Sequence, residues 1–270
     1  MSGYVLTATG KMGLKISVTL VIIGAEMIAM EVVERSMDRA VIFDLYETLI
    51  TENHPEWHAE ARTAGERLGL SQEDFEREWF ARYQARMTGK FRCYSDVLRE
   101  ICCACEIAPP EEEISTMQAE KLAAKARPFE RLDPLVVETL YKLKASGYRI
   151  GLISNCAFDE MAAWDSSELA VQVDVTMFSC VEGLTKPNPA IYELACERLG
   201  VDNSAAVYVG DGGSDELRGA DATGLTAIWA TWYIEKWPWD WVGYAAKTSD
   251  AFPRCRRICD LPAVVDDMYT

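Results

Sequence analysis

Short apolar runs alternate with segments of helical periodicity along most of the chain. The apolar runs predict buried strands at 40–45, 149–154, 173–179, 206–210 and 226–230. Helical segments such as 135–145 and 189–199 separate these strands. Because strands that alternate with helices build parallel sheets covered on both faces, the pattern predicts an α/β fold with a doubly wound, Rossmann-like parallel sheet.

A long insert separates the first two predicted strands. Residues 51–133 show helical periodicity almost throughout, with helices expected at 55–68, 71–87, 95–106 and 111–126. Ser71 followed by Asp74 marks a helix start, and Pro109 with Pro110 ends one helix before the next. We therefore expect three parts: an N-terminal extension of uncertain structure at 1–36, an α/β core domain at 37–51 and 134–270, and a helical domain at 52–133.

Polar residues follow the predicted strands in a fixed order. Asp44 ends the first apolar run, Ser154 ends the second, and Asp211 directly follows the fourth. Lys186 precedes the helical segment 189–199, and Asp215 lies four residues after Asp211. The carboxyl ends of parallel strands meet at one edge of a sheet, so these side chains are expected to lie close together. Each of these residues alone could be a turn, helix-cap or surface residue. Only their occurrence together, in this order along the chain, is specific evidence for a functional site.

This set of residues resembles the haloacid dehalogenase-like hydrolase superfamily over most of the chain from about Arg39 onward. The segment Asp44-x-Tyr46-x-Thr48-Leu49 corresponds to the family pattern DxDxTL, except that Tyr46 replaces the second Asp. The second, third and fourth motifs correspond to Ser154, to Lys186-Pro187, and to Gly210-Asp211 with Asp215. The resemblance implies an α/β core with an inserted helical cap domain.

The resemblance also implies how a phosphatase site would work. Asp44 would attack phosphorus and form an aspartyl-phosphate, while Lys186 offsets the negative charges. Thr48, Ser154, Asn155 and Lys186 would bind the substrate. Mg²⁺ would be the cofactor, held by Asp44, the backbone carbonyl of Tyr46, Asp211 and Asp215.

Tyr46 is the main departure from the family's phosphatases. A phenol with a reference pKa of about 10 is a poor general base at neutral pH. A Tyr here resembles the 2-haloacid dehalogenases of the same superfamily, which attack carbon without a metal but lack an acid at the place of Asp211. Three hypotheses stay open: a phosphatase for a small phosphorylated metabolite, a 2-haloacid dehalogenase, and a protein that binds a phosphorylated ligand without turnover.

Two nearby groups bear on the missing acid-base residue. His54 and His58 are four residues apart and would share one helix face over the nucleophile, but the favoured alternative is that both are solvated surface residues. Glu47 follows Tyr46 directly and is expected to point elsewhere. The Trp-rich segment 229–241 follows the last predicted strand, where its rings would stack on an organic leaving group, pack a long loop on the core or form a dimer contact.

Composition limits the partners and the setting. A formal net charge of −16 argues against a nucleic-acid partner. The apolar stretch 16–25 is too short to span a membrane, and Glu26 interrupts it, which argues against a signal peptide. An N-terminal extension, or a start codon placed upstream of the true one near Met37, is therefore favoured. Nine cysteines without zinc-site spacing suggest reduced thiols in a cytoplasmic protein, with a soft-metal site at 102–105 as the alternative. We expect a small-molecule substrate, no membrane partner, and a monomer or homodimer.

Overall fold

The computed structural model describes residues 39–54, 63–237 and 251–269, together with the backbone of three N-terminal strands. A six-stranded sheet has the order β6-β5-β4-β7-β8-β9, and all of its strand pairs are parallel. Its strands are β4 (Ala40–Phe43), β5 (Arg149–Ser154), β6 (Val175–Phe178), β7 (Ala206–Gly210), β8 (Thr226–Ala230) and β9 (Arg254–Cys255). The predicted α/β fold is confirmed, while the short strand β9 was not predicted.

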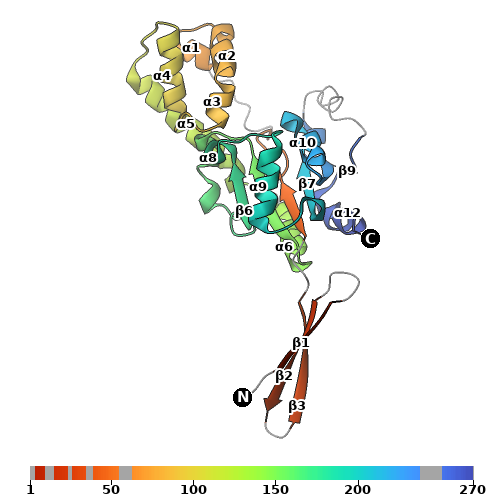
Figure 1. Cartoon of the computed structure of the whole chain (residues 1–270). Coiled ribbons are helices and arrows are strands. Elements are labelled where there is room, and N and C mark those ends of the chain that lie inside the picture. The colour runs from red at the N-terminus through yellow and green to blue at the C-terminus, as the bar shows by residue number, and fades with distance from the viewer. Residues whose placement is uncertain are drawn as a thin grey trace.

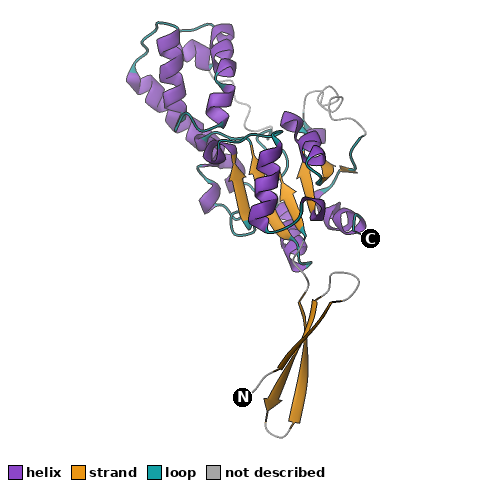
Figure 2. Ribbon diagram, in the orientation of Figure 1, coloured by secondary structure: helices purple, strands orange, loops and turns teal. Residues whose placement is uncertain are grey.

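Helices cover both faces of this sheet (Figure 2). Helices α6 (Pro134–Ala145) and α12 (Leu261–Asp267) pack on one face, and α9 (Pro189–Leu199) and α10 (Glu216–Ala222) pack on the other. Strand β4 contributes Val41 and Phe43 to the first apolar cluster, and Ala40 and Ile42 to the second. Because both faces of the strand are buried, its sequence is a continuous apolar run without alternation.

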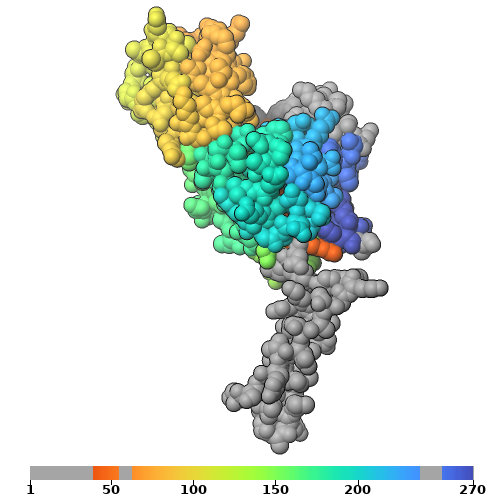
Figure 3. Space-filling model, in the orientation of Figure 1, coloured from red at the N-terminus to blue at the C-terminus, as the bar shows by residue number. Residues whose placement is uncertain are grey.

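The inserted helices lie together at the upper left of Figure 1, and the space-filling view shows this part of the chain as an orange and yellow lobe (Figure 3). They are α1 (Ala64–Leu68), α2 (Gln72–Ala81), α3 (Tyr83–Met87), α4 (Tyr94–Ala104) and α5 (Glu111–Glu130). These helices share an apolar cluster that includes Phe75, Leu98 and Ile101. The helix expected at 71–87 is two helices, which meet at Arg82, and residues 55–62 lie outside the described part of the chain. The boundaries 52–133 of this domain stay a prediction.

Three strands lie in the predicted N-terminal extension (Figure 1). Strand β2 (Lys15–Ile23) pairs antiparallel with both β1 (Tyr4–Thr9) and β3 (Glu26–Glu34). The apolar stretch noted in the sequence therefore forms most of a strand. Among the described residues, no helix is both long and apolar enough to cross a membrane.

Candidate active site

The sheet order places the candidate residues at one edge. Strand β4 lies between β5 and β7, so the carboxyl ends of three adjacent strands meet here: Ser154 ends β5, and Asp44 and Asp211 directly follow β4 and β7. A cavity of about 330 Å³ opens there. The predicted site residues that line it are Asp44, Tyr46, Ser154, Asn155, Lys186 and Asp211. Thr48 and Asp215 are not among its lining residues.

A buried ammonium joins two carboxylates in this cavity. Lys186 Nζ lies 2.5 Å from Asp44 Oδ1 and 2.5 Å from Glu216 Oε2. It also donates to the hydroxyl of Tyr208 at 3.1 Å, and that hydroxyl donates to Glu216 Oε2 at 2.7 Å. The Lys186 side chain is only 3% exposed, so these partners replace nearly all of its hydration.

Burial and mutual repulsion govern the protonation of this network. Burial, and after it the charge of Glu216, raises the pKa of Asp44 to about 7 despite the opposing effect of Lys186. Burial likewise raises the pKa of Glu216, and Lys186 again opposes the shift. Burial disfavours the charged form of Lys186, but the two carboxylates outweigh it and raise the pKa of the ammonium. Lys186 therefore stays protonated, whereas Asp44 titrates near neutral pH in the metal-free protein.

Three buried carboxylates could hold a cation. Asp44, Asp211 and Glu216 each offer one oxygen, and these oxygens all lie within 4.8 Å of one another. Asp215, the acid expected from the sequence, is 58% exposed instead and lies 3.6 Å from Arg218 on the solvent side. The donors are all oxygens and all acidic, which is the set that a hard cation such as Mg²⁺ prefers.

The spacing from Asp211 predicted Asp215 as the second acid of the site and did not identify Glu216. Helix α10 buries Glu216, Leu217 and Ala220 together, which share one helix face, while Asp215 and Arg218 face solvent. The apolar periodicity of this helix could therefore have identified Glu216. Its carboxylate accepts from the backbone N–H of Gly212 at 3.0 Å.

Gly210 allows the close approach of Glu216 to strand β7. A Cβ atom at position 210 would lie 2.1 Å from Glu216 Oε1 and 2.7 Å from its Cδ. Glycine is therefore required at the end of β7 if the carboxylate is to reach Lys186.

Asn155 holds the backbone of Lys186. Its Nδ2 donates to the Lys186 carbonyl at 2.9 Å, and its Oδ1 accepts from the Lys186 N–H at 2.8 Å. The expected substrate-binding residue thus positions Lys186. Ser154 is 1% exposed and lines the cavity, whereas the buried hydroxyl of Thr48 has no hydrogen-bond partner among the described residues.

Tyr46 contacts the segment after β5 and helix α5 of the insert. Its hydroxyl donates to the backbone carbonyl of Glu160 at 2.7 Å, and Lys125 Nζ lies 5.0 Å from its ring centre. Burial, reinforced by the charge of Glu160, raises the pKa of Tyr46 well above its usual value. Tyr46 is therefore a neutral hydrogen-bond donor at neutral pH. His54 does not line the cavity, and His58 lies outside the described residues.

Glu47 lines the cavity, so the expectation that it points elsewhere was wrong. Its backbone has a positive φ of 58°, and the side chain is 8% exposed. The carboxylate accepts from Thr51 Oγ1 and the Glu52 N–H at 2.8 Å each, and from Trp237 Nε1 at 3.0 Å. Burial raises the pKa of Glu47, so this carboxyl retains its proton to higher pH than usual.

Three tryptophans after β7 hold the loops of the site. Trp229 Nε1 donates to the carbonyl of Asp211 and Trp232 Nε1 to the carbonyl of Thr48, each at 2.9 Å, and Trp237 reaches Glu47 as above. The indoles pack and also orient the loops that carry Asp44 and Asp211. Positions 239 and 241 lie outside the described residues.

Comparison with known proteins identifies two related activities. A glyceraldehyde 3-phosphate phosphatase of Methanopyrus kandleri is 28% identical over 206 residues, which cover 71% of this chain and 83% of that enzyme. The (S)-2-haloacid dehalogenase 4A of Burkholderia cepacia is 37% identical over 97 residues, which cover 35% of this chain and 41% of that enzyme. The match to the dehalogenase therefore spans less than half of its length.

The fold has solved counterparts. A crystal structure of 2-haloacid dehalogenase from Pseudomonas syringae pv. Tomato DC3000 superposes with a TM-score of 0.58 at 24% identity, over 86% of this chain and all of that one. At this identity the likeness concerns the fold alone. Residues 39–223 match the family model of the haloacid dehalogenase-like hydrolases, from just before β4 to just after α10. The matched residues are more than half of the chain, which therefore belongs to the haloacid dehalogenase-like hydrolase family.

Proposed function

We propose that the protein is a Mg²⁺-dependent phosphatase for a small phosphorylated metabolite, with Asp44 as its nucleophile. The group of buried carboxylates around Asp44 supports this most, because a carboxylate repels a phosphoryl dianion unless a cation lies between them. Attack on carbon in a 2-haloacid needs no second acid beside the nucleophile, and Asp211 is such an acid. The similarity to a phosphatase over 71% of the chain points the same way.

The proposed reaction has two displacements at phosphorus. An oxygen of Asp44 attacks, and the ester P–O bond breaks with its electron pair on the leaving oxygen, which takes up a proton. Water then attacks the phosphorus of the aspartyl-phosphate, which restores Asp44 and releases inorganic phosphate. Lys186 fixes and partly neutralises Asp44, and the Ser154 hydroxyl donates to a phosphoryl oxygen.

Mg²⁺, when bound, would supply the remaining neutralisation of charge. Asp44, Asp211 and the backbone carbonyl of Tyr46 would hold it, with Glu216 retained on Lys186. Glu216 is the acid buried beside Lys186, whereas Asp215 is exposed to solvent.

The second candidate is a 2-haloacid dehalogenase, favoured by Tyr46 at the third place of the first motif and by the 37% identity to the Burkholderia cepacia enzyme. Assays of phosphate and chloride release across a panel of phosphomonoesters and 2-chloro acids, with Mg²⁺ or EDTA, separate the two. We expect phosphate release that needs Mg²⁺. Chloride release in EDTA would establish the dehalogenase, and binding of phosphorylated ligands with neither product would indicate a protein without turnover.

The metal assignment predicts a difference between two neighbouring acids. Asp211→Asn should lower kcat/KM by at least about 100-fold, since even outer partners of metal ligands cost 10–100-fold. It should also abolish the rise in melting temperature that Mg²⁺ gives the wild type. Asp215→Asn is the matched control and should retain both properties, because Asp215 is exposed. The reverse ranking of the two variants would assign the metal to Asp215.

Glu47 is proposed to protonate the leaving group, because its carboxyl lines the cavity and has a raised pKa. Glu47→Gln should lower kcat on an alkyl phosphate by about 100-fold, and less on an aryl phosphate whose leaving group needs little protonation. Tyr46→Phe is the control. It should lose one hydrogen bond to Glu160, worth about 1 kcal/mol of stability, with kcat nearly unchanged. An equal loss of activity in Tyr46→Phe would make Tyr46 the proton carrier.

The proposal also includes the cellular compartment, the substrate class, the oligomeric state and the two domains. All nine cysteines are free thiols, including those at 102, 103 and 105, which supports a reducing compartment such as the cytoplasm. A small-molecule substrate and a monomer or homodimer, with an α/β core and a helical cap, fit the family.

A further inference from the structure

Two buried cysteines lie next to each other beyond the carboxyl ends of β5 and β6. These strands pair in parallel with Ser154 opposite Phe178, and Cys156 and Cys180 each follow that pair by two residues. Cys156 is 0% exposed and Cys180 is 4% exposed. Neither cysteine lines the cavity that contains Asp44. The fold therefore brings two thiols together directly behind the candidate active site.

Hydrogen bonds hold this cysteine pair in place. Ser179 Oγ accepts from the Cys156 N–H at 2.9 Å and donates to the Cys156 carbonyl at 3.3 Å. The thiol of Cys156 is hydrogen-bonded to the thiol of Cys180, whose Sγ lies 3.9 Å from Met161 Sδ. A disulfide requires Cβ atoms about 4 Å apart, so two thiols already in hydrogen-bond contact can be joined by a small movement.

The two thiols differ in acidity. The hydrogen bond from Cys156 lowers the pKa of Cys180, against the opposing effect of burial. The same contact, together with burial, raises the pKa of Cys156 well above its ordinary value. Since the thiolate is the reactive form of cysteine, Cys180 is the member that reacts first with an oxidant, and Cys156 is the thiol that then reacts with it.

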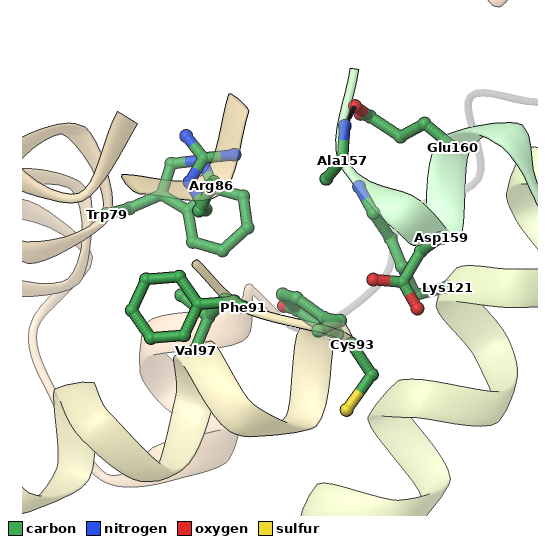
Figure 4. A pocket seen from close by; sticks show the side chains of 10 residues that line it. Trp79, Arg86, Phe91, Cys93, Val97, Lys121, Ala157, Asp159 and Glu160 are labelled. Carbon is green, nitrogen blue, oxygen red and sulfur yellow. Dashed lines mark hydrogen bonds between the residues drawn. The ribbon is translucent and has the colours of Figure 1, made fainter. Parts of the chain in front are cut away.

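Cys156 is connected to the candidate active site. Its thiol is also hydrogen-bonded to the side chain of Ser154, which lines the cavity. The preceding residue, Asn155, holds both backbone groups of Lys186. The residues that follow Cys156 line a narrow pocket opposite the inserted helices, and Figure 4 shows Ala157 on one side of this pocket and Trp79 on the other. A movement of Cys156 would therefore displace groups that position the substrate and Lys186.

We propose that Cys180 and Cys156 are an oxidation site for hydrogen peroxide, and that the disulfide between them displaces Ser154 and Asn155 and lowers the activity. The Cys180 sulfur attacks one peroxide oxygen, and the O–O bond breaks with its electron pair on the other oxygen, which leaves as water after taking up the thiol proton. The Cys156 sulfur then attacks the sulfenic sulfur of Cys180, and the S–O bond breaks to release a second water that carries the Cys156 proton. One peroxide is reduced and two thiols are oxidised.

The oxidant has to be small. Cys180 is nearly inaccessible, and the turn after α3 lies against its backbone: a Cβ atom at Gly89 would be 2.0 Å from the Cys180 carbonyl oxygen. Hydrogen peroxide is close to water in size, whereas oxidised glutathione is a bulky disulfide. A transient disulfide of this kind is also compatible with a reducing compartment. The formation of the disulfide is independent of the proposed phosphatase activity, and only its effect on turnover depends on it.

The test is peptide mapping of the full chain after treatment with a series of hydrogen peroxide concentrations. Unreacted thiols are blocked, and a protease that cleaves after Glu separates the two cysteines into peptides 139–160 and 169–182. We expect these peptides to be joined, two hydrogen atoms lighter than their sum, and to be separated by dithiothreitol. Oxidised glutathione should not join them. Phosphate release should fall by about 10-fold or more as the joined peptide appears and return with dithiothreitol, since small displacements of positioning groups are costly.

Substitutions make the test specific. Cys180→Ala and Cys156→Ala should each form no joined peptide and keep their turnover in peroxide. Cys196→Ala is the matched control, because Cys196 is equally buried at 1% exposure but packs in the other apolar cluster, and it should respond as the wild type does.

Three results would overturn the proposal: no joined peptide in the wild type, equal loss of turnover in Cys180→Ala, or a joined peptide with unchanged turnover. A reduced protein that releases no phosphate would contradict the proposed function instead, and the joined peptide would still decide whether the cysteine pair is an oxidation site.

Discussion

Asp44→Asn should abolish hydrolysis and leave the fold intact. Removal of a catalytic nucleophile lowers kcat by about 10⁴- to 10⁶-fold in well-studied hydrolases, and an amide cannot attack phosphorus. The fold should survive because the substitution is nearly isosteric and Lys186 keeps Glu216 as its partner at 2.5 Å. In metal-free buffer the variant should be no less stable than the wild type, since burial and Glu216 already disfavour an ionised Asp44.

The measurements for Asp44→Asn are steady-state kinetics and thermal unfolding on the same preparation. Asp174→Asn is a suitable control, because that acid is 37% exposed, pairs with Lys144 and does not line the cavity. A stably folded Asp44→Asn variant with more than about one part in 10³ of wild-type turnover would contradict covalent catalysis by Asp44.

Lys186→Met should impair both activity and stability. The ammonium is the shared partner of Asp44 and Glu216, and loss of one member of a buried ionic cluster costs about 3–5 kcal/mol. Turnover should fall by at least about 100-fold, because the nucleophile loses the group that fixes and neutralises it. Lys144→Met is the control: its pair with Asp174 is partly exposed and should contribute about 0–1 kcal/mol.

The stability of Lys186→Met should also change with pH in a defined direction. Without Lys186 the pKa values of Asp44 and Glu216 rise further, so the folded state holds more protons than the unfolded state at neutral pH. Stability in EDTA should therefore decrease as pH rises from about 5 to 8, more steeply than in the wild type. A variant that is equally stable at both ends of this range would contradict the assigned charge network.

The fold could be predicted because its signals are local. Buried parallel strands such as β4 and β7 appear as continuous apolar runs, and helices such as α9 show their own periodicity. Asp44, Ser154 and Asp211 could be grouped in advance, because parallel strands bring their carboxyl ends to one edge of the sheet.

Features that depend on side-chain direction and tertiary packing could not be predicted in the same way. Glu216 lies in the site and Asp215 does not, because of which face of α10 is buried. Glu47 enters the cavity through a left-handed backbone conformation, which is uncommon for a residue with a side chain.

Mass spectrometry of enzyme quenched in acid during turnover is the most direct test of the central claim. With a phosphorylated substrate and Mg²⁺, we expect a phosphoryl group on the peptide that contains Asp44, and none in EDTA or in Asp44→Asn. Release of phosphate without this adduct, or an adduct formed from a 2-chloro acid in EDTA, would contradict a Mg²⁺-dependent phosphatase that acts through Asp44.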